Sequence, residues 1–92
     1  MEFEWDLKKE ETNFRKHKVS FEEAASVFAD VLAAVYEEPD HSTEDMRFLT
    51  IGTSVDGRLL HVAFADRGQR LGIISARKVT RKERRLYEEE KR

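Results

Sequence analysis

Basic side chains gather near the carboxyl end of this 92-residue chain, after an apolar run that ends at Arg77. Five more basic residues follow within eight positions, with Glu83 as the one acid among them: Lys78, Arg81, Lys82, Arg84 and Arg85. A guanidinium group stays charged at any relevant pH, and its planar fork matches the oxygens of a phosphate. Such side chains can bind the backbone of RNA or DNA and stabilise the extra charge of a phosphorane.

Several arginines fall within the segments expected to form strands, or at the ends of those strands: Arg47, Arg58, Arg67, Arg70 and Arg77. We expect their guanidinium groups to converge on one surface of a sheet. If the last strand is regular, Arg77 shares a face with Ser75, Ile73 and Leu71. Alternatively, these arginines pair with acids of the first half, because residues 1–45 carry a net charge of -8 and residues 46–92 one of +6. Composition does not choose between the two interpretations.

Proton transfer near neutral pH is best served by imidazole, which draws attention to Lys16 and His17. One of these side chains could face the arginine-bearing sheet as an acid, a base or a phosphate ligand. The alternative is that both cations simply interact with the dipole at the end of the first helix. Trp5 is open to two interpretations as well, as a core residue at a strand end or as a platform for a base.

Other kinds of chemistry find little support in the sequence. The chain has no cysteine, which excludes thiolate catalysis and disulfides, and it lacks the usual nucleotide-binding and hydrolase motifs. A few potential metal ligands occur together in one polar segment: Asp40, His41, Glu44 and Asp45. Their spacing matches no known ligand pattern, so we expect an exposed turn, no metal and no cofactor.

The length and composition predict one domain over residues 1–92. No apolar run approaches the roughly 20 residues that span a bilayer. The acidic beginning, MEFEWD, is unlike a signal peptide. We therefore expect a cytoplasmic protein with no membrane association.

The elements that would position these residues can be read from pattern and capping. Strands and helices are expected in the order strand, helix, helix, four strands and helix, with these approximate spans: 3–5, 7–17, 21–32, 33–38, 46–54, 58–66, 70–77 and 80–90. Asp6 is a good N-cap, and Ser20 with Glu23 and Thr80 with Glu83 match the capping-box pattern, in which each side chain binds the backbone N–H of the other residue.

Turn signals at Asp56-Gly57 and at Gly68 join the last three strands into an antiparallel meander. The segment from Pro39 to Asp45 is expected to be a polar loop. The predicted fold is α+β, a mostly antiparallel sheet with two N-terminal helices packed on it. The final helix has few apolar residues and is expected to pack along an edge or against another chain.

Three blocks of the sequence resemble the BrnT-type toxin family over nearly the whole chain. They begin with FEWD and KHKVSFEEAASVF, continue with HSTEDMRFLTIGTSVDGRLLHVAF, and end with RGQRLGIISARKVTRKERRLYEE. The resemblance implies a RelE-like fold and the toxin half of a bacterial type II toxin–antitoxin pair, which cleaves RNA without a metal. It also implies neutralisation by a BrnA-type antitoxin, through which alone the complex contacts operator DNA.

On this hypothesis a phosphate is held by Arg77, Arg67 and Arg58, while the proton carriers are sought among His17, Lys16 and Asp66. Further contacts to RNA are expected from Arg47, Arg70, Arg81, Lys82 and Trp5.

Three positions depart from the usual family pattern: Lys18 stands in place of Gly, Asp66 in place of Glu, and Gly72 in place of a basic residue. The changes at Asp66 and Gly72 motivate an alternative, a catalytically weakened member that acts mainly as antitoxin partner and co-repressor. A third interpretation is a nucleic-acid-binding module without turnover.

Overall fold

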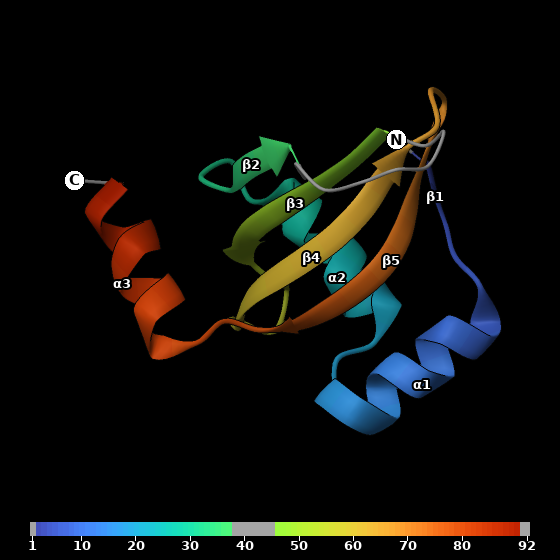
Figure 1. The fold of residues 1–92 in the computed structure, drawn as a ribbon, viewed down its shortest axis with the longest axis horizontal. Coiled ribbons are helices and arrows are strands. Elements are labelled where there is room, and N and C mark those ends of the chain that lie inside the picture. The colour runs from blue at the N-terminus through green and yellow to red at the C-terminus, as the bar shows by residue number, and fades with distance from the viewer. Residues whose placement is uncertain (1, 38–45, 91–92) are drawn as a thin grey trace.

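The computed structural model describes residues 2–37 and 46–90, which form three α-helices, a short 3-10 helix and five strands (Figure 1). In chain order these elements are β1 (Glu2–Glu4), α1 (Leu7–His17), α2 (Phe21–Ser26), η1 (Val27–Ala29), β2 (Ala34–Glu37), β3 (Met46–Thr53), β4 (Leu59–Asp66), β5 (Arg70–Lys78) and α3 (Arg81–Glu90). The polar loop expected over Pro39 to Asp45 lies outside the described residues, as does the cluster of potential metal ligands.

The five strands form one sheet in the order β1-β5-β4-β3-β2. Strands β2 to β5 are antiparallel neighbours, which confirms the predicted meander, and β1 adds a parallel pair at the edge of β5. Gly57 and Gly68 occupy the two hairpin turns with φ values of +80° and +86°. Glycine tolerates this left-handed region because it has no Cβ.

Helices α1 and α2 both contact β5: α2 lies behind the strands, and α1 lies beside β5 (Figure 1). Phe21 on α2 is fully buried, and the core continues through Val62 on β4 and Ile73 on β5. Burial of apolar side chains on this face stabilises the fold. The predicted α+β architecture with two N-terminal helices packed on the sheet is therefore confirmed.

The second helix is shorter than its apolar spacing predicts. It was expected to reach Leu32, but α2 ends at Ser26, continues as the 3-10 turn η1, and leaves Leu32 60% exposed. Asp30 explains the stop, because its carboxylate accepts hydrogen bonds from the backbone N–H of Leu32 at 2.9 Å and of Thr53 at 2.7 Å. An Asp that binds nearby backbone donors competes with continuation of a helix.

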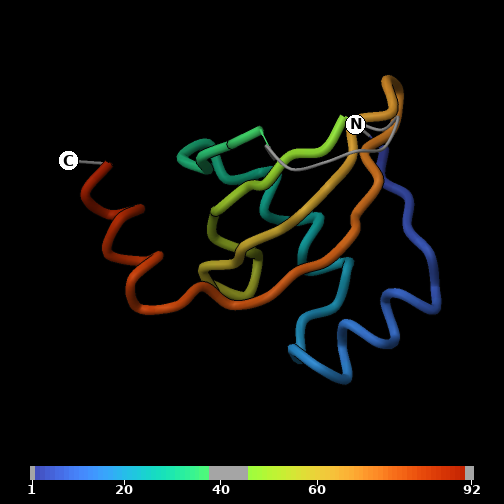
Figure 2. The backbone as a smooth tube through the Cα atoms, in the orientation of Figure 1, coloured from blue at the N-terminus to red at the C-terminus, as the bar shows by residue number. Residues whose placement is uncertain are grey.

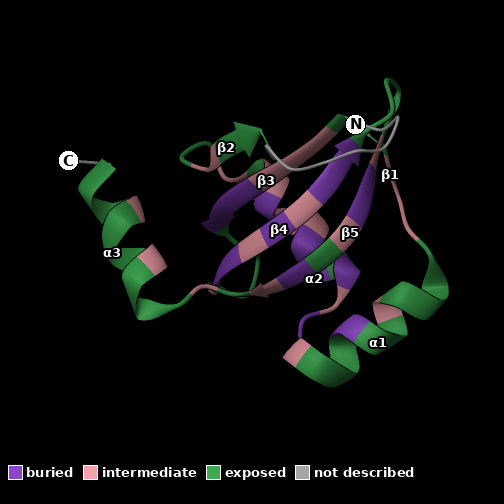
Figure 3. Cartoon of the chain, in the orientation of Figure 1, coloured by how far each residue is buried: buried purple, intermediate pink, exposed green. Residues whose placement is uncertain are grey.

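Helix α3 stands apart from the sheet, and most of its surface is exposed (Figure 3). The hydroxyl of Tyr87 donates to the carbonyl of Leu32 at 3.1 Å, and that of Tyr36 donates to Glu90 at 2.7 Å. At its amino end the Thr80–Glu83 capping box forms as predicted, with bonds of 2.9 and 3.1 Å. The two tyrosine bonds connect α3 to the edge strand β2 and to Leu32, and the expectation that the helix packs along an edge or against another chain stays a prediction. None of the helices in residues 2–37 and 46–90 is long and apolar enough to cross a membrane.

Candidate active site

A β-bulge in β5 decides which side chains of this strand face away from the helices. Phe64 pairs with Ile73 and Ala63 pairs with Ser75, so Ile74 is the extra residue of the bulged strand. The alternation of faces is reversed beyond it. The expectation that Arg77 shares a face with Ile73 and Leu71 is therefore wrong, whereas Ser75 and Arg77 do lie on one face.

His61 and Arg77 are direct cross-strand partners on β4 and β5. Residues opposite each other in an antiparallel pair have Cβ atoms about 4.5–5.5 Å apart, so their side chains meet. His17 comes to the same place from the end of α1. All three line one hollow of about 250 Å³, together with Leu49, Ala63, Ser75 and Ala76, and we call it the imidazole hollow.

Asn13 fixes α1 in the position that brings His17 to this hollow. It is the one buried residue of the helix, and its amide bonds to both backbone groups of Ala76. The Nδ2 donates to the carbonyl of Ala76 at 2.9 Å and to that of Val19 at 3.1 Å, while Oδ1 accepts from the N–H of Ala76 at 3.1 Å. The side chain thus anchors α1 to β5 one residue before Arg77.

Glu83 of α3 orients Arg77 through two parallel bonds, Nη1 to Oε1 and Nη2 to Oε2, each 2.8 Å long. Nη1 also donates to the carbonyl of Lys78 at 3.2 Å. These bonds use three of the five guanidinium donors, which leaves two for another acceptor. Hydrogen bonding from Arg77 lowers the pKa of Glu83 to about 2, so this carboxylate is ionised at neutral pH.

The electrostatic environment of His61 favours the neutral imidazole. Burial lowers the pKa of His61, the positive charge of Arg77 lowers it further, and the charge of Glu83 acts in the opposite direction. A neutral imidazole can accept a proton. His17 is the last residue of α1.

The expected convergence of arginines on one surface is wrong. Arg58 lies at the β3–β4 turn, where Nε donates to Glu23 at 2.8 Å and Nη2 donates to the same carboxylate. Glu23 is only 7% exposed, and the bonds from Arg58 and from Ser54 lower its pKa. Arg58 therefore neutralises a buried carboxylate, and this pairing also leaves the Ser20–Glu23 capping box half formed, with only the bond from the N–H of Glu23 to Ser20.

Arg67 and Arg70 lie at the other end of the sheet, beside the β4–β5 turn, as the path of the chain in Figure 2 makes clear. Arg67 donates to Glu4 at 2.8 Å, and Arg70 lies 3.5 Å from the same carboxylate. The alternative that arginines pair with acids of the first half holds here. The pKa of Glu4 is lowered by these contacts, chiefly by the hydrogen bond from Arg67.

Asp66 supports the same turn, because its carboxylate accepts the N–H of Gly68 at 3.0 Å. The strand register separates Asp66 from His61 by five residues of β4, roughly 17 Å at about 3.3 Å per residue. The guanidinium of Arg67 lies directly over the backbone of Gly72. A Cβ atom added to Gly72 would be only 2.5 Å from Nη1 of Arg67. A basic group therefore occupies this place although residue 72 itself has no side chain.

The remaining predicted contacts are distributed over other surfaces. Arg81 and Lys82 are exposed in the first turn of α3, and Arg47 on β3 has a buried Nε with no hydrogen-bond partner in the described part of the chain. Trp5 is half-buried and meets the ring of Phe21 edge-on, with centroids 6.1 Å apart. Trp5 therefore packs against the core with part of its surface, and it also lines a hollow at the protein surface.

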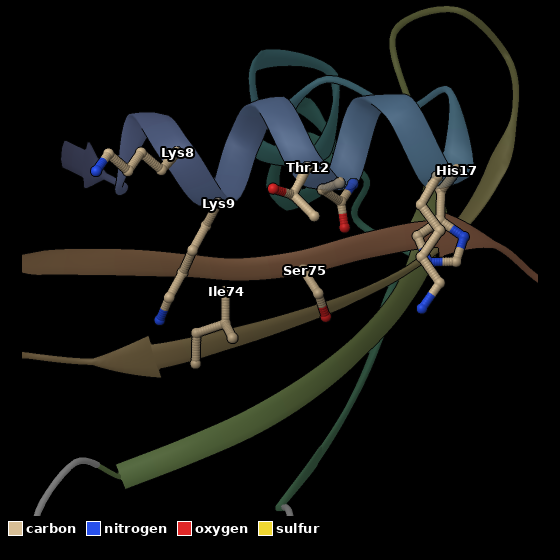
Figure 4. Close-up of a pocket in the computed structure, with 8 residues that line it drawn as sticks. Lys8, Lys9, Thr12, His17, Ile74 and Ser75 are labelled. Carbon is tan, nitrogen blue, oxygen red and sulfur yellow. The ribbon is translucent and has the colours of Figure 1, made fainter.

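Lys16 lines a groove of about 380 Å³ between α1 and β5. Figure 4 shows this groove with Lys9 and His17 of α1 on one side and Ser75 on the other. The groove and the hollow share His17 and Ser75. Of the residues singled out from sequence for catalysis, the structure therefore brings together Arg77, His17 and Lys16. It leaves Arg58, Arg67 and Asp66 elsewhere.

Nothing in the sequence singles out His61, because His17, His41 and His61 are far apart along the chain. The only sequence signal would have been its place in an alternating strand, opposite the strand that carries Arg77. In the described residues no group of three or more His, Asp or Glu side chains could hold a metal ion.

These observations define a class of protein: a small α+β domain with an imidazole–guanidinium hollow on its open sheet face. Over residues 5–83 the sequence matches the family of ribonuclease toxins, BrnT, of type II toxin–antitoxin systems, and the chain belongs to this family. The crystal structure of the Brucella abortus ribonuclease toxin BrnT is similar, with a TM-score of 0.67 and 26% identity over 88% of this chain and 99% of that one. Comparison with curated protein sequences gives no match.

Proposed function

We propose that this protein is a metal-independent endoribonuclease toxin whose reaction takes place in the imidazole hollow. The observation that carries the proposal is that His17, His61 and Arg77, from three different elements, line one hollow. Two imidazoles can act as general base and general acid, and a guanidinium can stabilise the charge of a phosphorane. The site therefore contains the groups that cleavage of RNA requires.

In this reaction the 2′-hydroxyl of the RNA attacks the adjacent phosphorus and the bond from phosphorus to O5′ breaks. Neutral His61 takes the proton of the 2′-hydroxyl, and His17, from the carboxyl end of α1, gives a proton to the leaving O5′. The products are a 2′,3′-cyclic phosphate and a 5′-hydroxyl. Arg77, held by Glu83, directs its two remaining donors at the phosphate.

The cognate partner is a BrnA-type antitoxin that covers this surface until it is released, and the complex contacts operator DNA only through the antitoxin. The family is one of toxin–antitoxin systems, which supports a protein partner. Like its partner, the free toxin acts in the cytoplasm.

The alternative of a catalytically weakened member was motivated by Asp66 and Gly72. The structure gives specific reasons to favour the active enzyme. Asp66 serves the β4–β5 turn at a distance from the imidazole hollow, and the guanidinium of Arg67 occupies the space over Gly72. Neither departure removes a group from the hollow itself.

The test uses purified protein and a single-stranded RNA in buffer with a chelator of divalent cations. We expect cleavage with 2′,3′-cyclic phosphate ends, loss of cleavage when a 2′-deoxynucleotide replaces the cleaved position, and suppression by the antitoxin. Expression without the antitoxin should arrest growth. Intact RNA, together with normal growth and normal repression by the complex, would establish the weakened member instead.

A further inference from the structure

Three neighbouring hollows run along β5 and extend well beyond the site of cleavage. The imidazole hollow opens into the groove between α1 and β5, which we call the α1 groove, and they share His17 and Ser75. The α1 groove in turn shares Lys9 and Ile74 with a third hollow of about 430 Å³ beside Trp5, which we call the tryptophan hollow. Together these neighbouring hollows, which we call the track, extend from Arg77 to the amino end of the chain.

The α1 groove has the charge of a phosphate-binding surface. Three lysines on α1 line it, Lys8, Lys9 and Lys16, and no acidic residue is among its lining residues in the described chain. Figure 4 shows Lys9 reaching from α1 across the strands near Ile74, with His17 at the far end of the groove. Lysine ammonium groups along a groove contact the phosphate backbone and make its binding salt-dependent.

The floor of this groove is made by the bulge in β5. Ile74 is the extra residue, half-buried at the point where the α1 groove meets the tryptophan hollow. Bulges occur often beside active sites, where they redirect side chains. Here the bulge places an apolar side chain where a ribose or a base edge can rest, while Ser75 beyond it turns toward the imidazole hollow.

The tryptophan hollow has a different chemistry. Trp5 and Arg67 offer an aromatic ring and a guanidinium plane, the two groups on which nucleic-acid bases stack. Glu4 and Asp6 also line it, and their carboxylates would repel a phosphate but can accept hydrogen bonds from the exocyclic amine of a base. This hollow therefore suits a base, whereas the α1 groove suits the backbone.

We propose, resting on the ribonuclease function above, that the α1 groove and the tryptophan hollow bind the nucleotides that flank the cleaved bond. Lys9 and Lys16 contact flanking phosphates, and Trp5 receives a base at the end of the track. The substrate is accordingly single-stranded RNA that extends beyond the cleaved dinucleotide on one side, because a paired base could not enter the hollow.

Trp5 offers a direct readout because it is the only tryptophan of the chain. Binding of a 2′-O-methyl octanucleotide, which cannot be cleaved, should quench its fluorescence. A 2′-O-methyl dinucleotide, which fills only the imidazole hollow, should leave the fluorescence unchanged. If a bound octanucleotide does not quench the fluorescence, the proposal that Trp5 receives a base is refuted. Quenching by the dinucleotide would refute it equally.

Lys9→Gln tests the α1 groove, with Lys78→Gln as the control that removes the same charge from the end of β5, outside all three hollows. For Lys9→Gln we expect octanucleotide affinity to fall about 5- to 10-fold and the slope of log K against log salt concentration to flatten by about 0.7, as for one lost phosphate contact. Lys78→Gln should change neither. Equal octanucleotide affinities of Lys9→Gln and Lys78→Gln would refute the proposal that the α1 groove binds the RNA backbone.

Cleavage kinetics separate this proposal from the function on which it rests. The wild type should cleave an RNA octanucleotide with a higher kcat/KM than a dinucleoside monophosphate, and Lys9→Gln should lose that advantage while cleaving the shorter substrate at the wild-type rate. If both substrates are cleaved equally by the wild type, the flanking sites are refuted and the ribonuclease stands. If neither is cleaved while the octanucleotide still quenches Trp5, the ribonuclease is refuted and the track remains as a binding site.

Discussion

The ion pair between Arg77 and Glu83 allows a quantitative prediction about the junction between β5 and α3. The pKa of Glu83 is held at about 2, against an ordinary value of 4.5. At about 1.36 kcal/mol per pKa unit, this difference limits the contribution of the charged carboxylate to roughly 3 kcal/mol. The side chains of Arg77 and Glu83 are 36% and 28% exposed, so solvent screening reduces the expected contribution to about 1–2 kcal/mol.

Glu83→Gln removes this charge and keeps the shape, and glutamine can still complete the capping box with Thr80. We expect the free energy of unfolding at pH 7 to fall by about 1–2 kcal/mol, which lowers the Tm by roughly 4–16 °C in a domain of this size. Glu89→Gln, the same change on an exposed position of α3, serves as the control and should have little effect.

The pH dependence gives the sign of the effect. Because folding lowers the pKa of Glu83, its stabilisation is complete above the unfolded pKa near 4.5 and is lost as the pH falls toward 2. The wild type and Glu83→Gln should therefore differ at pH 7 and converge near pH 2, as measured by thermal unfolding in buffers across this range. A difference that is the same at both pH values, or absent at pH 7, would show that the ion pair with Arg77 does not stabilise the fold.

Three further changes test the supports of the site, each followed by chemical denaturation. Lys18→Gly should stabilise the protein by about 0.5–1 kcal/mol, because Lys18 caps α1 with a left-handed φ of 59°. The ammonium group of Lys18 lies over the ring of Phe14, 5.9 Å from its centroid, and destabilisation would show that this contact matters more. Arg58→Ala should cost about 2–3 kcal/mol by leaving the buried carboxylate of Glu23 unpaired, and no loss would argue against that pairing. Asn13→Ala should cost about 2–3 kcal/mol through its lost backbone bonds, and a neutral result would mean that α1 is held in place by other contacts.

Local signals in the sequence were sufficient for much of the fold. Asp6 and Thr80 cap α1 and α3 as predicted, and Gly57 and Gly68 form the hairpin turns that set the meander. These features depend on residues a few positions apart, whose preferences hold in most contexts. Lys18 occupies the left-handed cap of α1. Glycine adopts this conformation most easily, which explains why the family usually has glycine at this position.

The site could be predicted only in part, because it depends on contacts between distant residues. The bulge at Ile74 is hidden in a run that is apolar on both sides, so nothing in the spacing shows that the faces of β5 are exchanged there. The partner of Arg58 was equally hidden, since Glu23 fits a capping box and instead turns to the arginine. His61 joins His17 only because Asn13 docks α1 against β5.

Single-turnover cleavage of RNA by His17→Gln, His61→Gln and the double variant tests whether His17 and His61 act together on one phosphodiester. Each single change should lower the rate by about 10²–10⁴-fold. The double variant should lose much less than the product of the two effects, because groups that act as a unit are not additive. A folded single variant that cleaves RNA at the wild-type rate would show that the two histidines do not act together.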